Sequence, residues 1–273
     1  MTEGPSLDDL ATTKWAEIIP LVDQLVERAE TQGEWRVVPH TALAADDAKS
    51  RPHQMSHAAR MLLNAGIDNL NGVRHLVFGR PDAATPSIVL HQAAHAVLAR
   101  GAIENFAAGI WMLGPQRRDV RLERLLRWHV KNVKDQHAAV DRFGAEASGS
   151  RTRDEKLNEL IGKMIGIGGD SRGIRTGYTT TQTLVFADEF TGRDTQGLPS
   201  HFIWQLCSGF AHARPWASLS TLEREEHDTN DPNVVHLRLT SDISRALLAP
   251  LRAIELCEAM LARWHMLNTP AHT

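Results

Sequence analysis

Two pairs of polar side chains stand out in the most apolar segment of the chain. His91 and His95 are four residues apart, as are Arg100 and Glu104. Residues at this spacing share one face of an α-helix, and the rotation of about 100° per residue puts the two pairs on opposite faces. A helix that is apolar nearly all round lies at the centre of a bundle, where polar groups must be paired. Each pair is therefore part of a buried polar network or part of a site.

The histidine pair is a candidate metal site. Two histidines at this spacing can ligate zinc, but the zinc-protease motif needs Glu directly after the first one, and Gln92 stands there. A third ligand from His57, His75 or Asp68 is not required by any spacing. We therefore expect core histidines, with no metal and no other cofactor. A His-lined metal or small-ligand site is the alternative.

A second candidate is a basic stripe between residues 117 and 134. Seven basic residues against two acidic ones give this segment a net charge of +5. Most of them share one arc of the predicted helix, and such an arc can follow a phosphate backbone. The expected nucleic-acid contacts are Arg117, Arg121, Arg124, Arg127, Lys131 and Lys134. A solvated helix face or a dimer contact is the alternative.

The elements that position these residues are mostly long helices. Apolar periodicity, caps and Gly or Pro stops predict helices over about residues 7–25, 54–78, 87–113, 117–143, 154–165, 199–212 and 242–266, the last capped by Ser241. Residues 179–190 fit either a helix or a strand. Short connections favour antiparallel neighbours. We predict an all-α antiparallel bundle of about five to seven helices with a small β-hairpin near residues 217–239. Residues 1–52 form an N-terminal helix and connector and 53–273 the bundle core, within one domain overall.

Composition narrows the class of protein. Of 273 residues, 42% are hydrophobic and 23% are charged, as in an ordinary globular chain. The net charge of −3 excludes a globally basic nucleic-acid binder, and two cysteines exclude a disulfide framework. The polar start resembles no secretory signal, and the apolar stretch of residues 87–113 holds too many polar groups for a membrane span. We expect a cytoplasmic protein without a membrane partner.

Several segments together resemble a known group of proteins. They are 62–70 (LLNAGIDNL), 98–106 (LARGAIENF), 110–115 (IWMLGP) with Arg117 and Arg121, and 206–212 (LCSGFAH). This set is similar to an uncharacterised actinobacterial all-helical family that distantly resembles HEPN-like bundles of toxin–antitoxin and abortive-infection systems. The resemblance implies an all-α fold, often a homodimer, and in active members a ribonuclease site built from Arg and His in an R-x4–6-H motif.

The chain departs from that motif. Arg124 and His129 match its spacing, but an i, i+5 pair lies about 140° apart on a helix, with His129 toward the core and Arg124 outward. Better candidates for a catalytic site are Arg100 and Glu104 from one helix with Ser208 and His212 from another. Ser208 and His212 share a face, and His212 would act as general acid–base near a phosphate held by Arg100.

The leading hypothesis is a helical bundle that binds RNA or acts on it in stress or phage defence. If it acts on RNA, the expected activity is that of a metal-independent endoribonuclease. Its expected partners are RNA, a second copy of the chain in a homodimer and a small antitoxin. In a second hypothesis the same polar residues only order the core of a non-catalytic, homodimeric scaffold. The two hypotheses differ in whether Arg100, Glu104, Ser208 and His212 meet at a cleft open to solvent or are sealed and mutually satisfied.

Overall fold

Side-chain caps fix where several helices begin. Ser6 and Asp9 form a capping box at the start of the first helix. Thr179 and Gln182 form another, which makes residues 180–190 a helix rather than a strand.

The computed structural model describes residues 6–79, 88–91, 93–143, 151–168, 173–193 and 197–270. The elements are α1 (Leu7–Glu30), α2 (Ala42–Ser50), α3 (Met55–Phe78), α4 (Ala94–Leu113), α5 (Arg118–Phe143), α6 (Arg153–Ile167), the 3-10 turn η1 (Ile174–Thr176), α7 (Thr180–Phe190), α8 (Ser200–Ala211), α9 (Pro215–Thr221), β1 (Glu223–Asp228), β2 (Val235–Thr240) and α10 (Ile243–Leu267).

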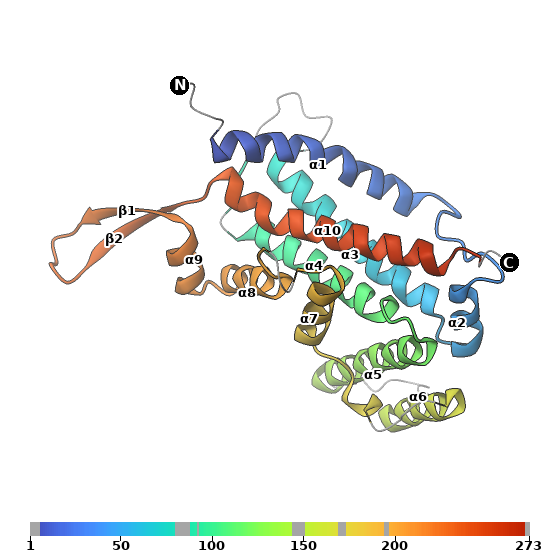
Figure 1. Cartoon of the computed structure of the whole chain (residues 1–273). Coiled ribbons are helices and arrows are strands. Elements are labelled where there is room, and N and C mark those ends of the chain that lie inside the picture. The colour runs from blue at the N-terminus through green and yellow to red at the C-terminus, as the bar shows by residue number, and fades with distance from the viewer. Residues whose placement is uncertain are drawn as a thin grey trace.

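Helix α4 is the centre of the molecule. It packs against α3, α10, α7 and α8, and α1 covers the outer side of α3 and α10 (Figure 1). Phe106 and Ile103 on α4 have no exposed surface. A Cβ at Gly66 of α3 would lie 2.4 Å from the ring of Phe106, so only glycine lets these two helices approach so closely. An apolar helix buried over most of its surface is what the sequence predicted for this segment.

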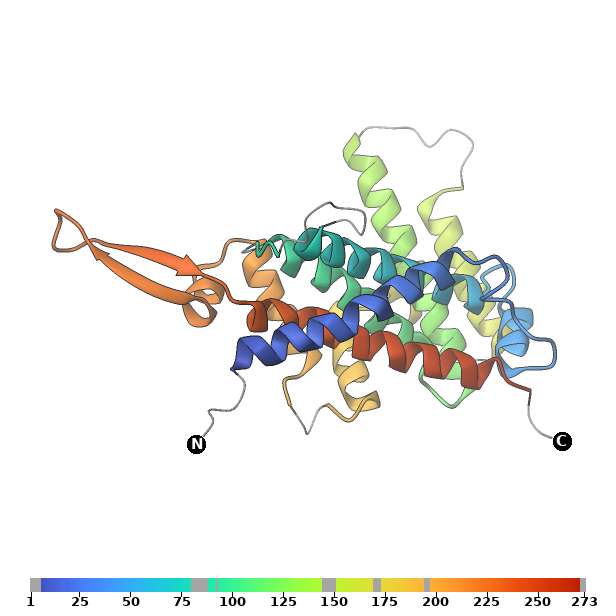
Figure 2. The same ribbon diagram turned by 90° about the horizontal axis from the view of Figure 1, so that it is seen from above.

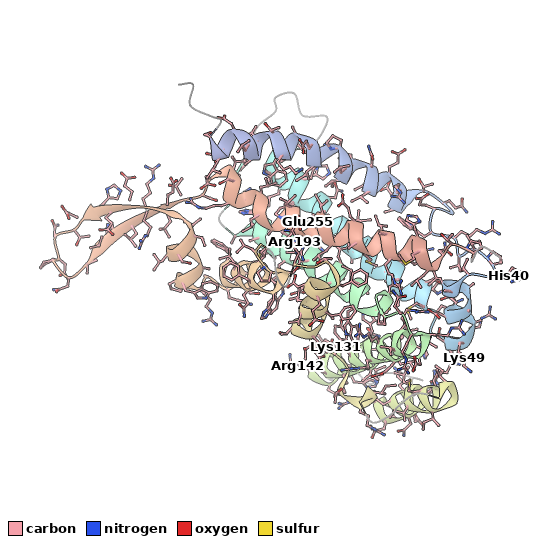
Figure 3. All side chains as sticks on the ribbon, viewed as in Figure 1. His40, Lys49, Lys131, Arg142, Arg193 and Glu255 are labelled. Atoms are coloured by element: carbon pink, nitrogen blue, oxygen red, sulfur yellow. The ribbon has the colours of Figure 1, made fainter. Side chains whose placement is uncertain are left out.

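A buried arginine joins three of the helices that surround this centre. Arg252 of α10 is 3% exposed and donates to the carboxylate of Asp188 in α7 at 2.9 Å and to the hydroxyl of Ser200 in α8 at 2.6 Å. Beside it, Arg193 and Glu255 form an ion pair at 2.7 Å (Figure 3). These contacts join three helices, because a buried guanidinium needs several acceptors at once.

Helices α5 and α6 enclose a separate, smaller core together with η1. Its buried members are Leu126, Val130, Leu157, Leu160, Met164 and Ile174. The two helices stand beside each other at one side of the main bundle (Figures 1 and 2). The molecule thus has one large hydrophobic core and a small one next to it.

The two strands form a hairpin that projects from the bundle at the end of α9 and returns to α10 (Figures 1 and 2). They pair antiparallel, with Glu223 opposite Thr240 and Asp228 opposite Val235. Eleven of the twelve strand residues are exposed. The hairpin therefore contributes little to either core.

The predicted all-α bundle with one small hairpin is confirmed, but the predicted number of helices is wrong. The described residues hold ten α-helices, because the short α2 and α9 lack a long apolar period. The central helix begins at Ala94 rather than after Pro86, and Asp242 rather than Ser241 caps α10. No helix in the described part of the chain is long and apolar enough to cross a membrane.

Candidate functional site

Arg100 and Glu104 meet on α4 as the sequence predicts, with a partner from α8. The Nε of Arg100 donates to Oε1 of Glu104 at 2.8 Å, and the indole N–H of Trp204 donates to the same oxygen at 2.5 Å. The guanidinium also lies over the Trp204 ring, 5.3 Å from its centroid. The Glu104 carboxylate thus binds Arg100 of its own helix and Trp204 of α8, which fixes α8 against α4.

Ser208 and His212 do not complete a catalytic group with this pair. The hydroxyl of Ser208 donates to the carbonyl of Trp204, one turn earlier in α8, at 2.9 Å. His212 is exposed and follows the last residue of the helix. Within the described residues no hydrogen bond or ion pair joins His212 to Arg100 or Glu104. The structure thus does not bring the four predicted residues together, and the Arg100–Glu104 pair stays partly exposed, at 26% and 33%.

The basic stripe of α5 is largely occupied by partners inside the molecule. Arg121 is 3% exposed and binds both carboxylate oxygens of Asp46 in α2 at 2.7 and 3.0 Å, so the expectation that it faces solvent is wrong. Arg117 pairs with Asp119 and Lys131 with Asp135. A stripe whose cations are already paired offers less charge to a phosphate backbone than the sequence suggests.

The other three cations of the stripe bind backbone carbonyls. Arg124 donates to the carbonyl of Trp111 at 2.6 Å and lies over Phe186, 4.0 Å from the ring centroid. Burial lowers the pKa of Arg124 to about 10, and the expectation that it points outward is wrong. Arg127 donates to the carbonyl of Gly177 at 2.7 Å, and Lys134 to that of Arg175. These bonds fasten the segment that contains η1 along α5.

The histidine pair is not on one helix. His91 precedes α4, which begins at Ala94, so the i, i+4 relation with His95 does not place the two rings on one helical face. Among the described residues, no group of three or more His, Cys, Asp or Glu side chains is arranged to hold a metal ion. His95 is buried, at 7% exposed, as the apolar helix predicts.

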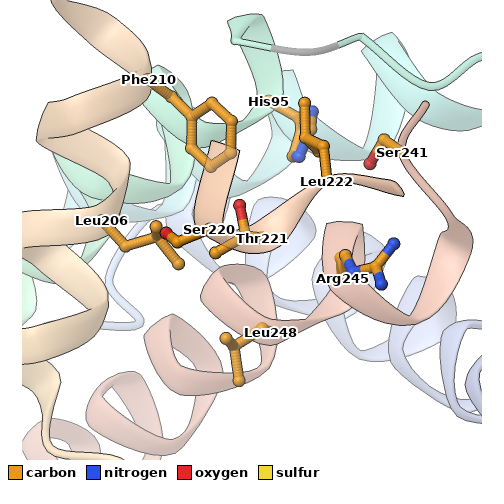
Figure 4. Close-up of a pocket in the computed structure, with 9 residues that line it drawn as sticks. All are labelled: His95, Leu206, Phe210, Ser220, Thr221, Leu222, Ser241, Arg245 and Leu248. Carbon is orange, nitrogen blue, oxygen red and sulfur yellow. The ribbon is translucent and has the colours of Figure 1, made fainter. Parts of the chain in front are cut away.

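His95 lines a pocket between α4, α8 and the base of the hairpin (Figure 4). The pocket has a volume of about 270 Å³. Its apolar wall consists of Leu206, Phe210, Leu222 and Leu248, and its polar wall of His95, Ser220, Thr221, Ser241 and Arg245. The lining comes from four stretches of the chain: α4, α8, the end of α9 with the link into the hairpin, and the link out of the hairpin with α10.

The polar groups of the pocket differ in charge and burial. Burial lowers the pKa of His95, which keeps the imidazole neutral at pH 7. Its Nδ1 is buried and has no hydrogen-bond partner within the described residues. The guanidinium of Arg245 is 39% exposed and pairs with Asp242 and, at 3.8 Å, with Glu223. The pocket therefore combines an apolar surface, one neutral imidazole and one cation.

Sequence reasoning found only one member of this pocket. His95 stood out as a polar residue on an apolar helix, whereas Arg245, Ser220 and Thr221 gave no signal. The two cysteines take no part, because burial raises the pKa of both Cys207 and Cys257 to about 12 and keeps the thiols protonated.

Comparison of the chain with protein-family models, with curated proteins and with solved structures finds no match. The HEPN-like resemblance stays a prediction.

Proposed function

We propose that the protein is a non-catalytic helical bundle that binds a small organic anion with an apolar body in the pocket beside His95. The observation that carries the proposal is the lining: four apolar side chains, a buried neutral imidazole and a partly exposed guanidinium around one cavity of about 270 Å³. Ligand sites are concave, mostly apolar and have a few convergent polar groups. This pocket has each of these properties.

The division of the wall suggests how the ligand lies. Leu206, Phe210 and Leu248 would cover its apolar body, and burial of that surface favours binding by about 25 cal/mol per Å². Arg245 pairs with Asp242 and Glu223 through Nη1, and its Nε and Nη2 would bind the anionic group of the ligand, because a guanidinium offers forked donors to a carboxylate. A neutral imidazole is either donor or acceptor according to its tautomer. His95 can therefore bind a polar atom of the ligand without adding charge.

The size of the pocket limits the ligand. Ligand pockets usually range from about 300 to 1,000 Å³, and this cavity of about 270 Å³ lies just below that range. A single aromatic or short branched monocarboxylate matches that volume and the single cation. A nucleotide or an oligonucleotide is too large and carries more charge than Arg245 alone can neutralise.

The ribonuclease hypothesis has less support than ligand binding. It requires His212 near a phosphate held by Arg100, whereas Arg100 binds Glu104 and stacks on Trp204, and His212 lies exposed at the end of α8. The pocket, in contrast, does not depend on the HEPN-like resemblance.

Calorimetry with three matched probes tests the proposal: benzoate, benzamide and benzylamine share one apolar ring and differ in charge. We expect benzoate to bind with a Kd of about 1 mM or lower, which is about −4 kcal/mol and reasonable for so few atoms. The uncharged amide should bind more weakly, and the cationic amine should not bind.

Variants then locate the binding. Arg245→Gln should weaken benzoate binding by about tenfold or more, since a hydrogen bond to a charged group contributes about 1.5–3 kcal/mol. Arg238→Gln is the matched control, because Arg238 lies on the hairpin outside the pocket. Equal binding of all three probes, or equal effects of the two arginine variants, would contradict the proposal.

A further inference from the structure

The hydroxyl groups that line the pocket beside His95 already donate their protons within the protein. Ser220 and Thr221 each donate to the backbone carbonyl one turn earlier in α9, both at 2.5 Å. Ser241 donates to the carbonyl of the next residue at 3.4 Å. A hydroxyl has one donor and two acceptor positions. Each of these side chains can therefore offer a ligand an acceptor only.

The imidazole of His95 adds a neutral group to the buried side of the pocket. The residue is 7% exposed, and its Nδ1 has no hydrogen-bond partner in the described part of the chain. Burial lowers the pKa of the ring, so it is neutral at pH 7 and has one donor and one acceptor nitrogen. The ring thus keeps hydrogen-bonding capacity that the protein does not use, and an unmatched buried polar group costs free energy.

The polar groups of the pocket also differ in depth. The guanidinium of Arg245 is 39% exposed, Thr221 is half-buried and His95 is buried. Figure 4 shows Arg245 and His95 on different sides of the cavity, with the hydroxyl of Thr221 directed toward the side of His95. A ligand whose carboxylate binds Arg245 at the mouth therefore directs the opposite end of its body toward Thr221 and His95.

We propose that the ligand is a hydroxylated aromatic monocarboxylate whose hydroxyl lies across the ring from the carboxylate and binds Thr221 and His95. This inference rests on the proposed function, from which it takes the pocket and the role of Arg245. The hydroxyl donates its proton to Oγ1 of Thr221 and accepts a hydrogen bond from the imidazole N–H of His95.

The same wall disfavours other ligands of this size. A purely apolar end would leave Thr221 and His95 without a partner. Among the described residues that line the pocket Arg245 is the one cation, so a second carboxylate at the inner end would lie unpaired. Phe210 in the apolar wall can pack against an aromatic ring, and a rigid ring holds the two polar groups apart.

Calorimetry with substituted benzoates tests this ligand class. The probes 4-hydroxybenzoate and 4-methylbenzoate are nearly equal in size and differ in hydrogen bonding, whereas 2-hydroxybenzoate has its hydroxyl beside the carboxylate. We expect 4-hydroxybenzoate to bind about tenfold or more tightly than 4-methylbenzoate, because a site that bonds a hydroxyl rejects the analogue that lacks it. The 2-hydroxy isomer should bind no more tightly than benzoate, since its hydroxyl stays at the mouth.

Variants assign the preference to the two side chains. Thr221→Val keeps the shape of the side chain and removes the acceptor, so the preference for 4-hydroxybenzoate over 4-methylbenzoate should fall to about twofold or less. Thr13→Val is the matched control, because the Thr13 hydroxyl also donates to a carbonyl one turn earlier, at 3.0 Å, but lies on α1 outside the pocket. His95→Phe should have the same effect as Thr221→Val, with folding checked by circular dichroism.

The outcomes separate this inference from the proposed function. Equal binding of 4-hydroxybenzoate and 4-methylbenzoate, with benzoate still bound through Arg245, would overturn the inference alone. A preference for 4-hydroxybenzoate that Thr221→Val leaves intact, or an equal gain for the 2-hydroxy isomer, would also overturn it. Failure of every probe to bind would overturn the inference and the proposed function together.

Discussion

His129 is a half-buried histidine whose protonation opposes the folded state. Its ring lies 4.5 Å from that of His53, centroid to centroid, and its Nε2 has no hydrogen-bond partner among the described residues. Burial, with a smaller contribution from His53, lowers the pKa of His129 from 6.5 to about 4. Burial also lowers the pKa of His53, although Glu159 acts against this shift. Both rings are therefore neutral in the native protein at pH 7.

The free energy of unfolding should fall between pH 6.5 and pH 4 because of His129. In this range the unfolded chain binds a proton that the folded chain does not, so the folded state is fully favoured above pH 6.5 and loses stability as the pH falls. At pH 5 the loss is about 2 kcal/mol. Urea unfolding at pH 7 and pH 5 measures it. His129→Gln should reduce the difference, and exposed His227→Gln should leave it unchanged. An unaltered difference in the His129 variant would contradict this account.

Side chains that sequence patterns assign to one apolar helix were predictable, and those that distant helices bring to the same pocket were not. The burial of His95 and the contact between Arg100 and Glu104 follow from spacing within α4. Arg245 and Thr221 reach the same pocket as His95 only because α9 and α10 meet at the base of the hairpin. No local pattern encodes that meeting, since it depends on how distant segments pack.

At the scale of elements, the long helices are predictable because each carries a long apolar period, and α1, α6 and α10 also begin at a side-chain cap. The short α2 has the cap Thr41 but no long apolar period, and it is held by tertiary contacts: Asp47 accepts the backbone N–H of Ser56 at 2.8 Å, and Asp46 binds Arg121. The basic stripe shows the same limit. Arg124 and Arg127 bind backbone carbonyls, and a carbonyl partner leaves no trace in a sequence.

Two glycine-to-alanine substitutions, one at the contact between α3 and α4 and one on α6, should have opposite effects on stability. Gly66→Ala should destabilise the protein by about 1–3 kcal/mol, because the new Cβ would lie 2.4 Å from an atom of the fully buried Phe106 ring. Gly162→Ala is the control within α6, where nothing lies within 4 Å of the added Cβ. There alanine should stabilise the helix by about 0.5–1 kcal/mol. Thermal melts compare the two, and a Gly66→Ala protein as stable as the native one would contradict the close packing.

The whole molecule is a large bundle with two attachments, the α5–α6 unit and the hairpin. The α6 helix packs against α5 and η1, and its buried residues belong to the smaller core. Elements with few buried apolar contacts open at lower free energy than the central core. We therefore expect α6 to open while α3, α4 and α10 remain folded.

Hydrogen exchange in two core variants distinguishes this partial opening from a single cooperative unit. Ile103→Ala, in the main core, should lower the opening free energy of α4 amides by about 2–5 kcal/mol. It should leave the opening free energy of α6 amides unchanged. The native state and the state with α6 open both retain the main core, so the substitution destabilises both by the same amount. Leu160→Ala, in the small core, should lower the protection of both helices. If Ile103→Ala lowers the protection of α6 as much as that of α4, the two cores unfold together.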